Sequence, residues 1–503
     1  MTHGASTLAA RSLRAVVWSY LGAGMRICAQ LVIQVGLARQ LGPAAFGQAS
    51  TVLLVMGLGW LLADAGFGSA LIQKEQLQDD DLAFALGWVV LLSTLIGVLT
   101  YGLSPWLAGL LNDPALVPLV RACAVLIPLQ ALSNIPLSLL RRDLDMKRQQ
   151  LLSVGTYVLG MGVVGFSLAV AGLGAWALVV GFGVQLALTL ALGFRLAPFP
   201  LRLRLHHANT AFRNFGLSVL ATNLANWSIE SLDRLLVGRF WGLKSLGEYA
   251  AAGNLARAPA SVLVGTLQAV VFSSTSRAQS DREQVRRGFV AVLCLVALVS
   301  TPLFCFLAVQ SAFVVQLLYG PSWSSAAPLF AALCLSIPSY AVLSIAGPTL
   351  WGLGAARSEF QVQLLIAVAT FGGYAALAGW PLAEAVWLVP VLSLIRSILI
   401  VRALLPRLNL SVRHVLHACA GGAALAIAAA LMAGAGLMLA PSPWTSVLVS
   451  AGLSALACTA VLRAAGRHLL VAELRSVMIQ RAAGSVWARR ACGWLGLQPG
   501  VAS

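Results

Sequence analysis

Ionisable and amide side chains recur at helical spacing inside an apolar stretch near the start of the chain. Within residues 13–38 they follow one another at steps of seven, four and four, and they are Ser19, Arg26, Gln30 and Gln34. Such steps place all four on one face of a helix. An arginine on a polar face can hold a phosphate or carboxylate through paired hydrogen bonds. The stripe therefore predicts a cationic surface that faces something other than lipid.

A second stripe lies in the apolar stretch over residues 214–237. Its members are Asn223, Asn226, Glu230, Asp233 and Arg234. An offset of 200 residues relates the two stripes, because Arg26 then corresponds to Asn226 and Gln30 to Glu230. Glu230 and Arg234 stand one helical turn apart, so they either neutralise one another on their own helix or line a shared polar cavity. Both interpretations stay open.

Further charges stand alone in apolar stretches, where even lenient insertion scales assign an arginine a cost of about 2.5 to 3.5 kcal/mol at a helix centre. They are Asp64, Arg121, Arg257 and Arg396. Arg26 and Arg257 lie deep within their predicted spans, and we predict that these two line a solvated cationic cavity. Arg121 and Arg396 lie near span ends, from which a long side chain also reaches the interface. Asp64 is equally suited to capping its helix.

The stretches that carry these charges are long enough to cross a membrane. Apolar residues make up 59% of the 503 residues and charged residues 10%, whereas soluble domains average about 25% charged residues. The mean hydropathy is +0.88. A membrane-crossing helix needs about 20 residues, and stretches of that length separated by polar or Gly/Pro breaks predict about 14 such helices. The predicted fold class is an all-α integral membrane protein.

Positive charge is distributed unevenly over the predicted breaks. Most of the 33 Lys and Arg fall in alternate breaks and near the two ends, as in the run RRDLDMKR at residues 141–148. Because cytoplasmic loops carry the excess of Lys and Arg, both termini are predicted to be cytoplasmic. The net charge of +17 then reflects membrane orientation and contact with anionic lipid, so nucleic acid is not an expected partner.

One short phrase occurs twice at the offset of the polar stripes. ARQLGPAAFGQAS begins at residue 38 and GRFWGLKSLGEYA at residue 238, so that Gly42 matches Gly242 and Gly47 matches Gly247. We predict equivalent outer turns after the first helix of each half, with the glycines supplying tight backbone geometry. The predicted organisation is two six-helix bundles at 1–200 and 201–407, two additional helices at 408–465, and a basic amphipathic cytoplasmic tail at 466–503.

Motifs for catalysis and metal binding are weak in this sequence. It contains no Gly-rich nucleotide-binding loop of the G-x-x-x-x-G-K-[ST] type. Asp143 and Asp145 form a D-x-D pair, but four basic residues surround it, which favours a charged cytoplasmic turn. His414, His417 and Cys419 have a spacing that a metal could use, yet no second ligand cluster follows. The eight cysteines include no C-x-x-C pair. We predict a protein that is not an enzyme and that has no metal or other cofactor.

Five fragments, taken together in their order and spacing, resemble the polysaccharide-export branch of the multidrug/oligosaccharidyl-lipid/polysaccharide flippase superfamily, the Wzx-type flippases. They are LARQLGPAAFGQAS, GFGSALIQ, LLRRDLDMKR, GLGAWALVVG and SLDRLLVGRFWGLKSLGEYAAAGNLAR. The resemblance extends from residue 10 to residue 465. It implies two pseudo-symmetric six-helix bundles plus two C-terminal helices, in the bacterial inner membrane.

The resemblance also implies an activity. Members of this family move undecaprenyl-diphosphate-linked oligosaccharide repeat units across the inner membrane by alternating access through a cationic lumen, for O-antigen, capsule or exopolysaccharide synthesis. On this reading Arg26 and Arg257 bind the diphosphate or acidic sugars, followed by Arg121, Arg234 and Arg396. An ion gradient or the membrane potential drives transport, and the candidate ion carriers are Asp64, Glu230 and Asp233. The implied partners are the lipid-linked oligosaccharide, membrane lipids, a polysaccharide polymerase and a chain-length regulator.

Two other functions fit parts of the sequence. A multidrug and toxin extruder of the same superfamily would share the fold, but a cavity for cationic drugs is expected to be acidic, whereas the predicted spans are rich in arginine. A membrane glycosyltransferase or polymerase is expected to carry a long outer loop with catalytic carboxylates, and the predicted outer breaks, such as YGPSW and GWPLAE, are short. The intramembrane arginines therefore favour transport of an anionic substrate.

Overall fold

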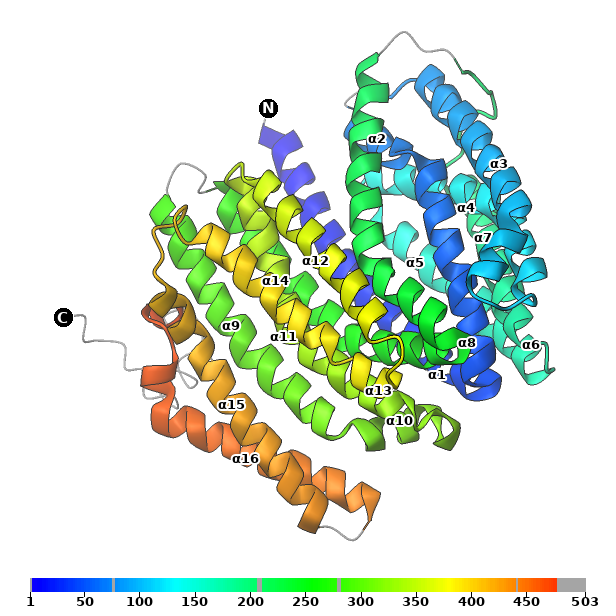
Figure 1. Ribbon diagram of the computed structural model, residues 1–503. Coiled ribbons are helices and arrows are strands. Elements are labelled where there is room, and N and C mark those ends of the chain that lie inside the picture. The colour runs from blue at the N-terminus through cyan, green and yellow to red at the C-terminus, as the bar shows by residue number, and fades with distance from the viewer. Residues whose placement is uncertain (1, 75–76, 206–209, 278–281, 440–441, 477–503) are drawn as a thin grey trace. The chain divides into compact units, whose positions relative to one another are not determined.

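The computed structural model describes residues 2–74, 77–205, 210–277, 282–439 and 442–476 (Figure 1). All regular secondary structure within these ranges is helical. Ten helices in the described part of the chain are long and apolar enough to cross a membrane. The predicted all-α, multi-pass membrane fold is confirmed, while the number of about 14 spans and the two-bundle layout stay predictions.

The chain divides into two compact units, Met1–Ala250 and Ala251–Ser503. The first unit contains α1 (Thr2–Asp64), α2 (Phe67–Gln73), α3 (Asp79–Leu110), α4 (Leu116–Arg142), α5 (Met146–Tyr157), the π-helix η1 (Val158–Gly165), α6 (Phe166–Val170), α7 (Ala175–Leu196) and the first part of α8 (Thr210–Arg277).

The second unit contains the rest of α8 and the helices that follow it. These are α9 (Arg282–Val309), α10 (Ser311–Tyr319), the 3-10 helix η2 (Pro321–Trp323), α11 (Ala326–Gly352), α12 (Ala356–Ala376), α13 (Leu382–Ala385), α14 (Leu388–Leu404), α15 (Val412–Leu439) and α16 (Pro443–Leu469). The predicted boundaries at residues 200, 407 and 465 stay predictions.

The repeated phrase forms two matching kinks. Inside α1, Gly42 has φ 71° and ψ 172°, and inside α8, Gly242 has φ 83° and ψ 174°. A positive φ is readily adopted only by glycine, and the helix resumes directly after each kink. The expected outer turns are therefore single-residue breaks, because one glycine in this conformation is enough to redirect the helix.

The second pair of glycines in the phrase lies where the two kinked helices cross within the first unit. A Cβ atom on Gly47 would lie 1.8 Å from the carbonyl oxygen of Leu243, and one on Gly247 would lie 2.0 Å from that of Pro43. Only a residue without a side chain allows backbones to approach so closely. The four residues are related by the offset of 200, so the sequence repeat corresponds to a reciprocal contact between backbones.

The core of the second unit gathers residues from α9, α11, α14 and α15. Its fully buried members include Leu293, Cys294, Ile345, Leu350 and Leu404, each 0% exposed. The segment after α16 contributes Leu470, Val471 and Leu474 to the same core. The start of the tail predicted at 466–503 thus packs inside the unit, whereas residues 477–503 lie outside the described residues.

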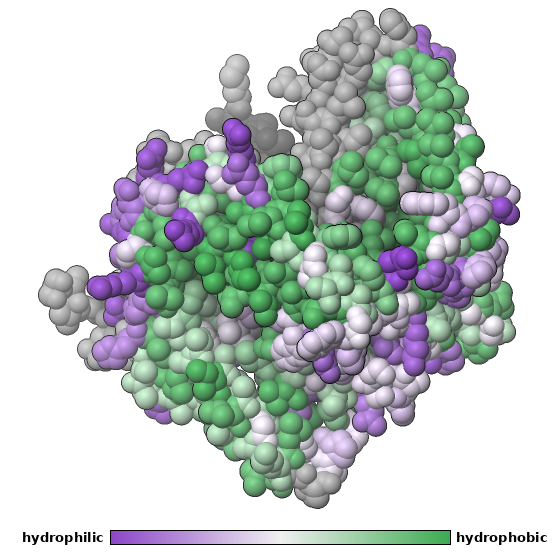
Figure 2. Space-filling view, viewed as in Figure 1, coloured by the Kyte–Doolittle hydropathy of each residue, from purple (hydrophilic) through white to green (hydrophobic). Residues whose placement is uncertain are grey.

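Exposed apolar side chains cover the outer faces of the helices. On α14 they include Val391, Leu394, Ile395 and Ile398, and Figure 2 shows the hydrophobic colouring of the region that α12 and α14 occupy in Figure 1. Helices whose backbone hydrogen bonds are satisfied internally can present such faces to lipid. The polar groups that serve a function must therefore be sought between the helices.

Candidate functional site

A polar cavity of about 340 Å³ lies among the helices of the first unit. Its walls come from α1, α2, α4, α5 and α7, and they carry two arginines, one carboxylate, three amides and two aromatic rings. These side chains are Arg26, Arg141, Asp64, Gln130, Asn134, Gln185, Trp60 and Phe182. Serine and threonine hydroxyls complete the walls, among them those of Ser133, Ser153, Thr156 and Thr189. We refer to this space as the Arg26 cavity.

Two positive charges act together in the Arg26 cavity. Arg26 comes from α1 and Arg141 from the last turn of α4, and the charge of Arg26 acts on Arg141. Within the described residues, neither guanidinium takes part in a salt bridge. Two like charges that share a cavity repel one another, and an anion that contacts both relieves the repulsion through charge-assisted hydrogen bonds. The pair is therefore suited to a phosphate or diphosphate group.

Asp64 lines the same cavity, and its hydrogen bonds stabilise the break between α1 and α2. Its Oδ1 accepts a hydrogen bond from Asn134 Nδ2 at 2.9 Å, and its carboxylate also accepts from the backbone N–H groups of Gly66 and Gly68. Gly66 has φ 78°, and α2 begins at Phe67. A carboxylate at the start of a helix satisfies unpaired N–H groups and complements the helix dipole. Asp64 thus caps α2 and fixes the Asn134 amide in the cavity wall.

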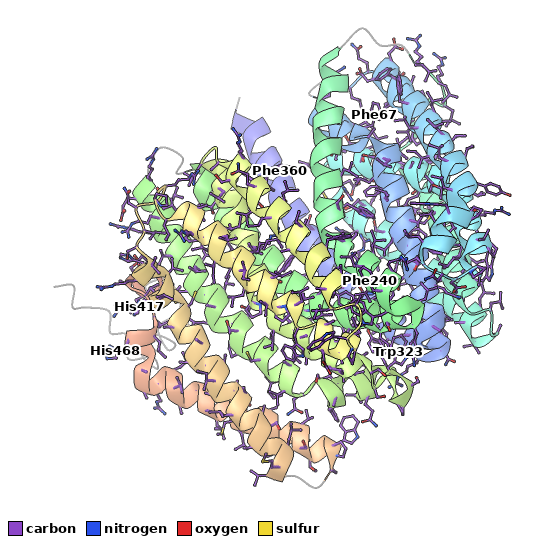
Figure 3. The ribbon with its side chains drawn as sticks, viewed as in Figure 1. Phe67, Phe240, Trp323, Phe360, His417 and His468 are labelled. Carbon is purple, nitrogen blue, oxygen red and sulfur yellow. The ribbon has the colours of Figure 1, made fainter. Side chains whose placement is uncertain are left out.

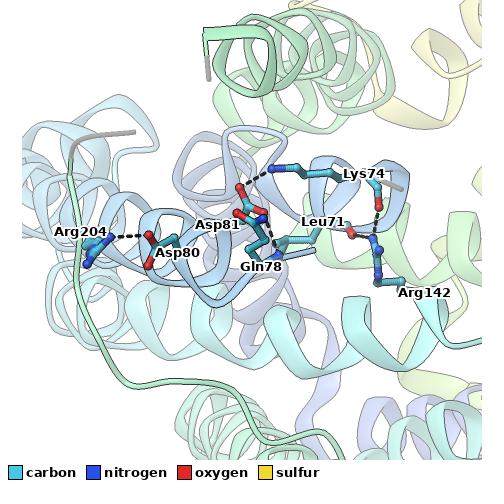
Figure 4. Close-up of polar contacts among 7 residues, drawn as sticks. All are labelled: Leu71, Lys74, Gln78, Asp80, Asp81, Arg142 and Arg204. Atoms are coloured by element: carbon cyan, nitrogen blue, oxygen red, sulfur yellow. Dashed lines mark hydrogen bonds and ion pairs between the residues drawn. The ribbon is translucent and has the colours of Figure 1, made fainter. Parts of the chain in front are cut away.

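A network of ion pairs and hydrogen bonds joins α2, α3 and α4 at one end of the first unit (Figure 4). Lys74 Nζ lies 2.5 Å from Asp81 Oδ1, and the Asp81 side chain is 0% exposed. Asp81 Oδ2 also accepts from the backbone N–H of Gln78 at 2.9 Å. Arg142 Nη1 donates to the carbonyl oxygen of Leu71 at 2.8 Å and to that of Lys74. These contacts hold the last turn of α4, from which Arg141 reaches the cavity.

The D-x-D pair predicted to form a charged turn lies between α4 and α5. Asp145 Oδ1 accepts from the backbone N–H of Arg148 at 3.1 Å, and its Oδ2 lies 3.4 Å from Arg148 Nη1. Leu144 between the two aspartates has φ 56°. Asp145 therefore acts as the N-cap of α5, which is a structural role that its position in a tight turn explains.

Arg121 and Arg234, both predicted to bind the substrate, lie elsewhere in the first unit. Arg121 Nε donates to Ser104 Oγ at 3.2 Å, and its guanidinium lies 4.9 Å from the centre of the Tyr101 ring. Arg234 is half-buried on α8 beside Asp233, whose Oδ2 accepts from Tyr249 Oη at 2.6 Å. Neither arginine is among the residues that line the Arg26 cavity. Glu230 lies outside the residues whose side chains are described.

The two remaining predicted arginines belong to the second unit. Arg257 is exposed on α8. Arg396 is half-buried on α14, and its charge acts on the buried carboxyl group of Glu359. Of the predicted site residues, the structure thus brings Arg26 and Asp64 into one cavity. The site roles of Arg121, Arg234, Arg257, Arg396, Glu230 and Asp233 stay predictions.

The sequence prediction missed Arg141, which was assigned to a cytoplasmic loop. A signal for it exists, because Gln130, Asn134 and Ser138 follow one another at steps of four and Arg141 comes three residues later. These steps place the four on one face of a helix, as in the stripe that contains Arg26. The basic run RRDLDMKR hid this pattern, since its neighbours read as loop residues.

The histidines near α15 make local contacts (Figure 3). His417 Nε2 lies 2.9 Å from the carbonyl oxygen of His468, and His414 Nδ1 lies 2.6 Å from Ser411 Oγ. In the ranges that the structure describes, no group of three His, Cys, Asp or Glu could hold a metal ion.

Comparisons with known proteins identify a family and related sequences. The family model described as polysaccharide biosynthesis protein matches residues 36–328. The succinoglycan biosynthesis transport protein ExoT of Rhizobium meliloti (strain 1021) is 27% identical over 380 residues, which cover 75% of this chain and 76% of ExoT. The lipopolysaccharide biosynthesis protein WzxC of Escherichia coli (strain K12) is 26% identical over 338 residues, which cover 65% of this chain and 67% of WzxC.

Solved structures share the fold at low sequence identity. The lipid II flippase MurJ in an inward closed conformation has a TM-score of 0.66 at 12% identity, with 90% of this chain and 99% of MurJ covered. An inward-facing multidrug resistance MATE family transporter of the MOP superfamily has a TM-score of 0.55 at 14% identity, with 78% and 94% covered. The expected resemblance to polysaccharide flippases is confirmed. Because the family model spans more than half of the 503 residues, the chain belongs to the polysaccharide biosynthesis protein family.

Proposed function

We propose that this protein moves lipid-linked polysaccharide precursors from the inner to the outer leaflet of the cytoplasmic membrane. The observation that carries the proposal is the Arg26 cavity, in which two arginines without a salt-bridge partner among the described residues share a polar space between helices. The proposal is supported by the family and by relatives named for succinoglycan transport and lipopolysaccharide biosynthesis.

The walls of the cavity suit the head group of such a precursor. A lipid diphosphate carries about two negative charges, and each guanidinium can make paired, charge-assisted hydrogen bonds to it. Amides and hydroxyls supply donors and acceptors for sugar hydroxyls, and the faces of Trp60 and Phe182 supply apolar surface. The polyprenyl chain stays in the lipid while the head group enters the protein. We take undecaprenyl diphosphate as the carrier on the basis of the family resemblance.

The proposed layout has both termini in the cytoplasm and about 14 spans arranged in two bundles. In this layout, the polar face of α8 lines the second bundle as the polar face of α1 lines the first. The glycine kinks support this count, because each divides one long helix into two segments. The end of α4 carries Arg141 and Arg142, which the charge rule assigns to the cytoplasmic side. The Arg26 cavity would then load its substrate from the inner leaflet.

Transport in this proposal is driven by an ion gradient or the membrane potential and needs no bound cofactor. Arg257 and the other arginines outside the cavity are proposed to contact the substrate at later steps. Two adjacent positive charges disfavour a cationic drug as the substrate, so the cavity supports the polysaccharide precursor over drug export.

The test compares variants of the full chain in a strain that lacks its own copy. Arg26→Ala and Arg141→Ala should each reduce polysaccharide export at least tenfold, because each removes hydrogen bonds to a charged group worth about 1.5–3 kcal/mol. Lipid-linked precursor should accumulate and stay inaccessible to an outer-leaflet probe in spheroplasts. Arg148→Ala removes an exposed arginine from the same basic run and serves as the matched control.

Membrane levels of all three variants are measured by immunoblot. Normal export by both cavity variants at normal protein levels would rule out the Arg26 cavity as the substrate site. Undisturbed export in the strain without the protein would rule out the proposed function itself.

A further inference from the structure

The second unit contains a buried carboxyl group that the proposed substrate site does not use. Glu359 lies in the first turn of α12 and is 8% exposed. Figure 3 marks this end of α12 by the labelled Phe360, which follows Glu359 in the chain. Helices α11 and α14 pack against α12, so the carboxyl group is enclosed by neighbouring helices. A charged group in such surroundings needs compensation to stay ionised.

Its hydrogen bonds satisfy only one of the two carboxyl oxygens. Oε1 accepts from Gln363 Nε2 at 2.8 Å, whereas Oε2 is buried without a hydrogen-bond partner among the described residues. The backbone of α11 lies against the group, because a Cβ atom on Gly347 would be 3.0 Å from Oε1. The side chain of Trp351 on the same helix also approaches the carboxyl. A buried polar atom that is left unsatisfied costs about 1–3 kcal/mol.

Among the described residues, the charge of Arg396 acts on this group from a helix packed against α12. Arg396 on α14 exerts an attractive electrostatic effect on the Glu359 carboxylate. Arg407, which follows α14 in the chain, donates to Ser358 Oγ in the first turn of α12 at 3.1 Å and to the carbonyl oxygen of Ala403. The ionised carboxylate is therefore disfavoured by burial and favoured by Arg396 and by the side chains of Gln363 and Trp351. Burial and the charge of Arg396 therefore act in opposite directions on the ionised carboxylate.

We propose that Glu359 is a proton-binding site whose charge state controls the packing of α12 against α14. When Glu359 is ionised, its attraction to Arg396 holds the two helices together; when it takes up a proton on Oε2, that attraction is lost. Glu359 thereby supplies the proton coupling of transport, so this inference rests on the proposed function. A metal cation is a poor occupant, because such ions need several oxygen ligands and the positive charge of Arg396 also acts on this single carboxylate.

Proton binding is tested on the purified full-length protein in lipid nanodiscs by infrared difference spectroscopy across a pH titration. The wild-type protein should show the carbonyl band of a buried protonated carboxylic acid, and Glu359→Gln should remove it. Glu384→Gln changes an exposed carboxylate of α13 and should leave the band unchanged. Arg396→Gln removes the stabilising charge, so the midpoint of the titration should move upward by about one pH unit or more.

Two results would overturn the proton site. One is a carboxylic acid band that survives in Glu359→Gln, and the other is a titration midpoint that Arg396→Gln does not move. A glutamate with a purely structural role would leave the band and its midpoint unaffected by these changes even where the variants lose stability.

Coupling to transport is tested in cells by the sensitivity of export to a protonophore. Wild-type and Glu384→Gln proteins should lose export when the proton gradient collapses. Glu359→Gln should export at least tenfold less and show no further loss with the protonophore. Normal, protonophore-sensitive export by Glu359→Gln at normal membrane levels contradicts the coupling. Failure of the proposed function would appear separately, as unchanged export in the strain without the protein.

Discussion

The arginines of the two units stand in opposite environments. In the first unit, Arg26 and Arg141 share a polar cavity of about 340 Å³ and lack a salt-bridge partner among the described residues. In the second unit, Arg396 is opposed by the buried carboxyl group of Glu359, with α11 packed against it. Both arrangements place arginine within apolar helices. Neighbouring side chains therefore decide whether such an arginine acts beside a second positive charge or on a buried carboxyl group.

Arg26→Glu should have the largest effect, because it replaces the pair of arginines in the Arg26 cavity with an arginine and a carboxylate, as found for Arg396 and Glu359 in the second unit. A carboxylate at residue 26 lies where its charge acts on Arg141, so the two would pair and repel an anionic head group. Export is expected to fall about 1000-fold, which corresponds to roughly 4 kcal/mol of lost binding. Arg26→Gln, which removes the charge without adding a carboxylate, should fall less. Equal losses in the two variants would show that pairing with Arg141 is irrelevant.

Gly47→Ala tests the reciprocal contact between Gly47 and Leu243 and between Gly247 and Pro43. The added Cβ would overlap the carbonyl oxygen of Leu243 at 1.8 Å, so the helices must separate, at an expected cost of about 3 kcal/mol, at the upper end for overpacking. The midpoint of thermal unfolding in detergent measures the loss. Gly102→Ala in α3 is the matched control, because no atom lies within 4 Å of its Cβ position. A Gly47→Ala protein as stable as Gly102→Ala would disprove the close crossing.

Arg396→Met tests the arrangement of the second unit, because it leaves the Glu359 carboxyl group without the positive charge of Arg396. The expected destabilisation is about 2 kcal/mol, below the roughly 3–5 kcal/mol for breaking a fully buried pair, because Arg396 is only half-buried. Replacing both residues, as in Arg396→Met with Glu359→Met, should restore stability close to that of the wild type. Thermal unfolding in detergent distinguishes the two proteins. If the double variant is as unstable as Arg396→Met, the two side chains do not form a compensated pair.

Asp64→Asn should have the smallest effect and distinguishes a helix cap from a charge carrier. Asparagine keeps an oxygen that can accept from Gly66 and Gly68, so the expected loss of stability is below 1 kcal/mol. Asp64→Ala removes the acceptor and should lose about 1 kcal/mol. Both are measured by thermal unfolding together with export. Loss of export in a stable Asp64→Asn protein would instead assign the negative charge of Asp64 to transport.

The sequence was sufficient to predict the membrane class and one of the two arginines of the Arg26 cavity. Arg26 was found because its stripe repeats at helical spacing within an apolar stretch, a pattern that depends only on residue order. Arg141 was missed because charged neighbours on both sides resemble a loop. Its place on α4 depends on the contacts of Arg142 with Leu71 and Lys74, which involve residues about 70 positions earlier.

Glu359 shows the same limit in the second unit. In the sequence it follows Arg357 at the start of a span, where a carboxylate reads as part of a solvated loop. Gly347 on α11 lies close to its carboxyl group, and the charge of Arg396 on α14 acts on it. Both residues come from other helices. Burial is a property of the packed helices, so no local pattern around residue 359 indicates it.

The repeated phrase shows most clearly what the sequence determines and what the tertiary structure determines. Its glycines and the offset of 200 residues are properties of the sequence alone, and they were enough to relate the two halves of the chain. Only the tertiary structure decided that Gly42 and Gly242 are kinks within continuous helices and that Gly47 and Gly247 bring two backbones into contact. Residue order determines which face of a helix is polar or small. What that face meets is decided by the packing of helices that lie far apart in the chain.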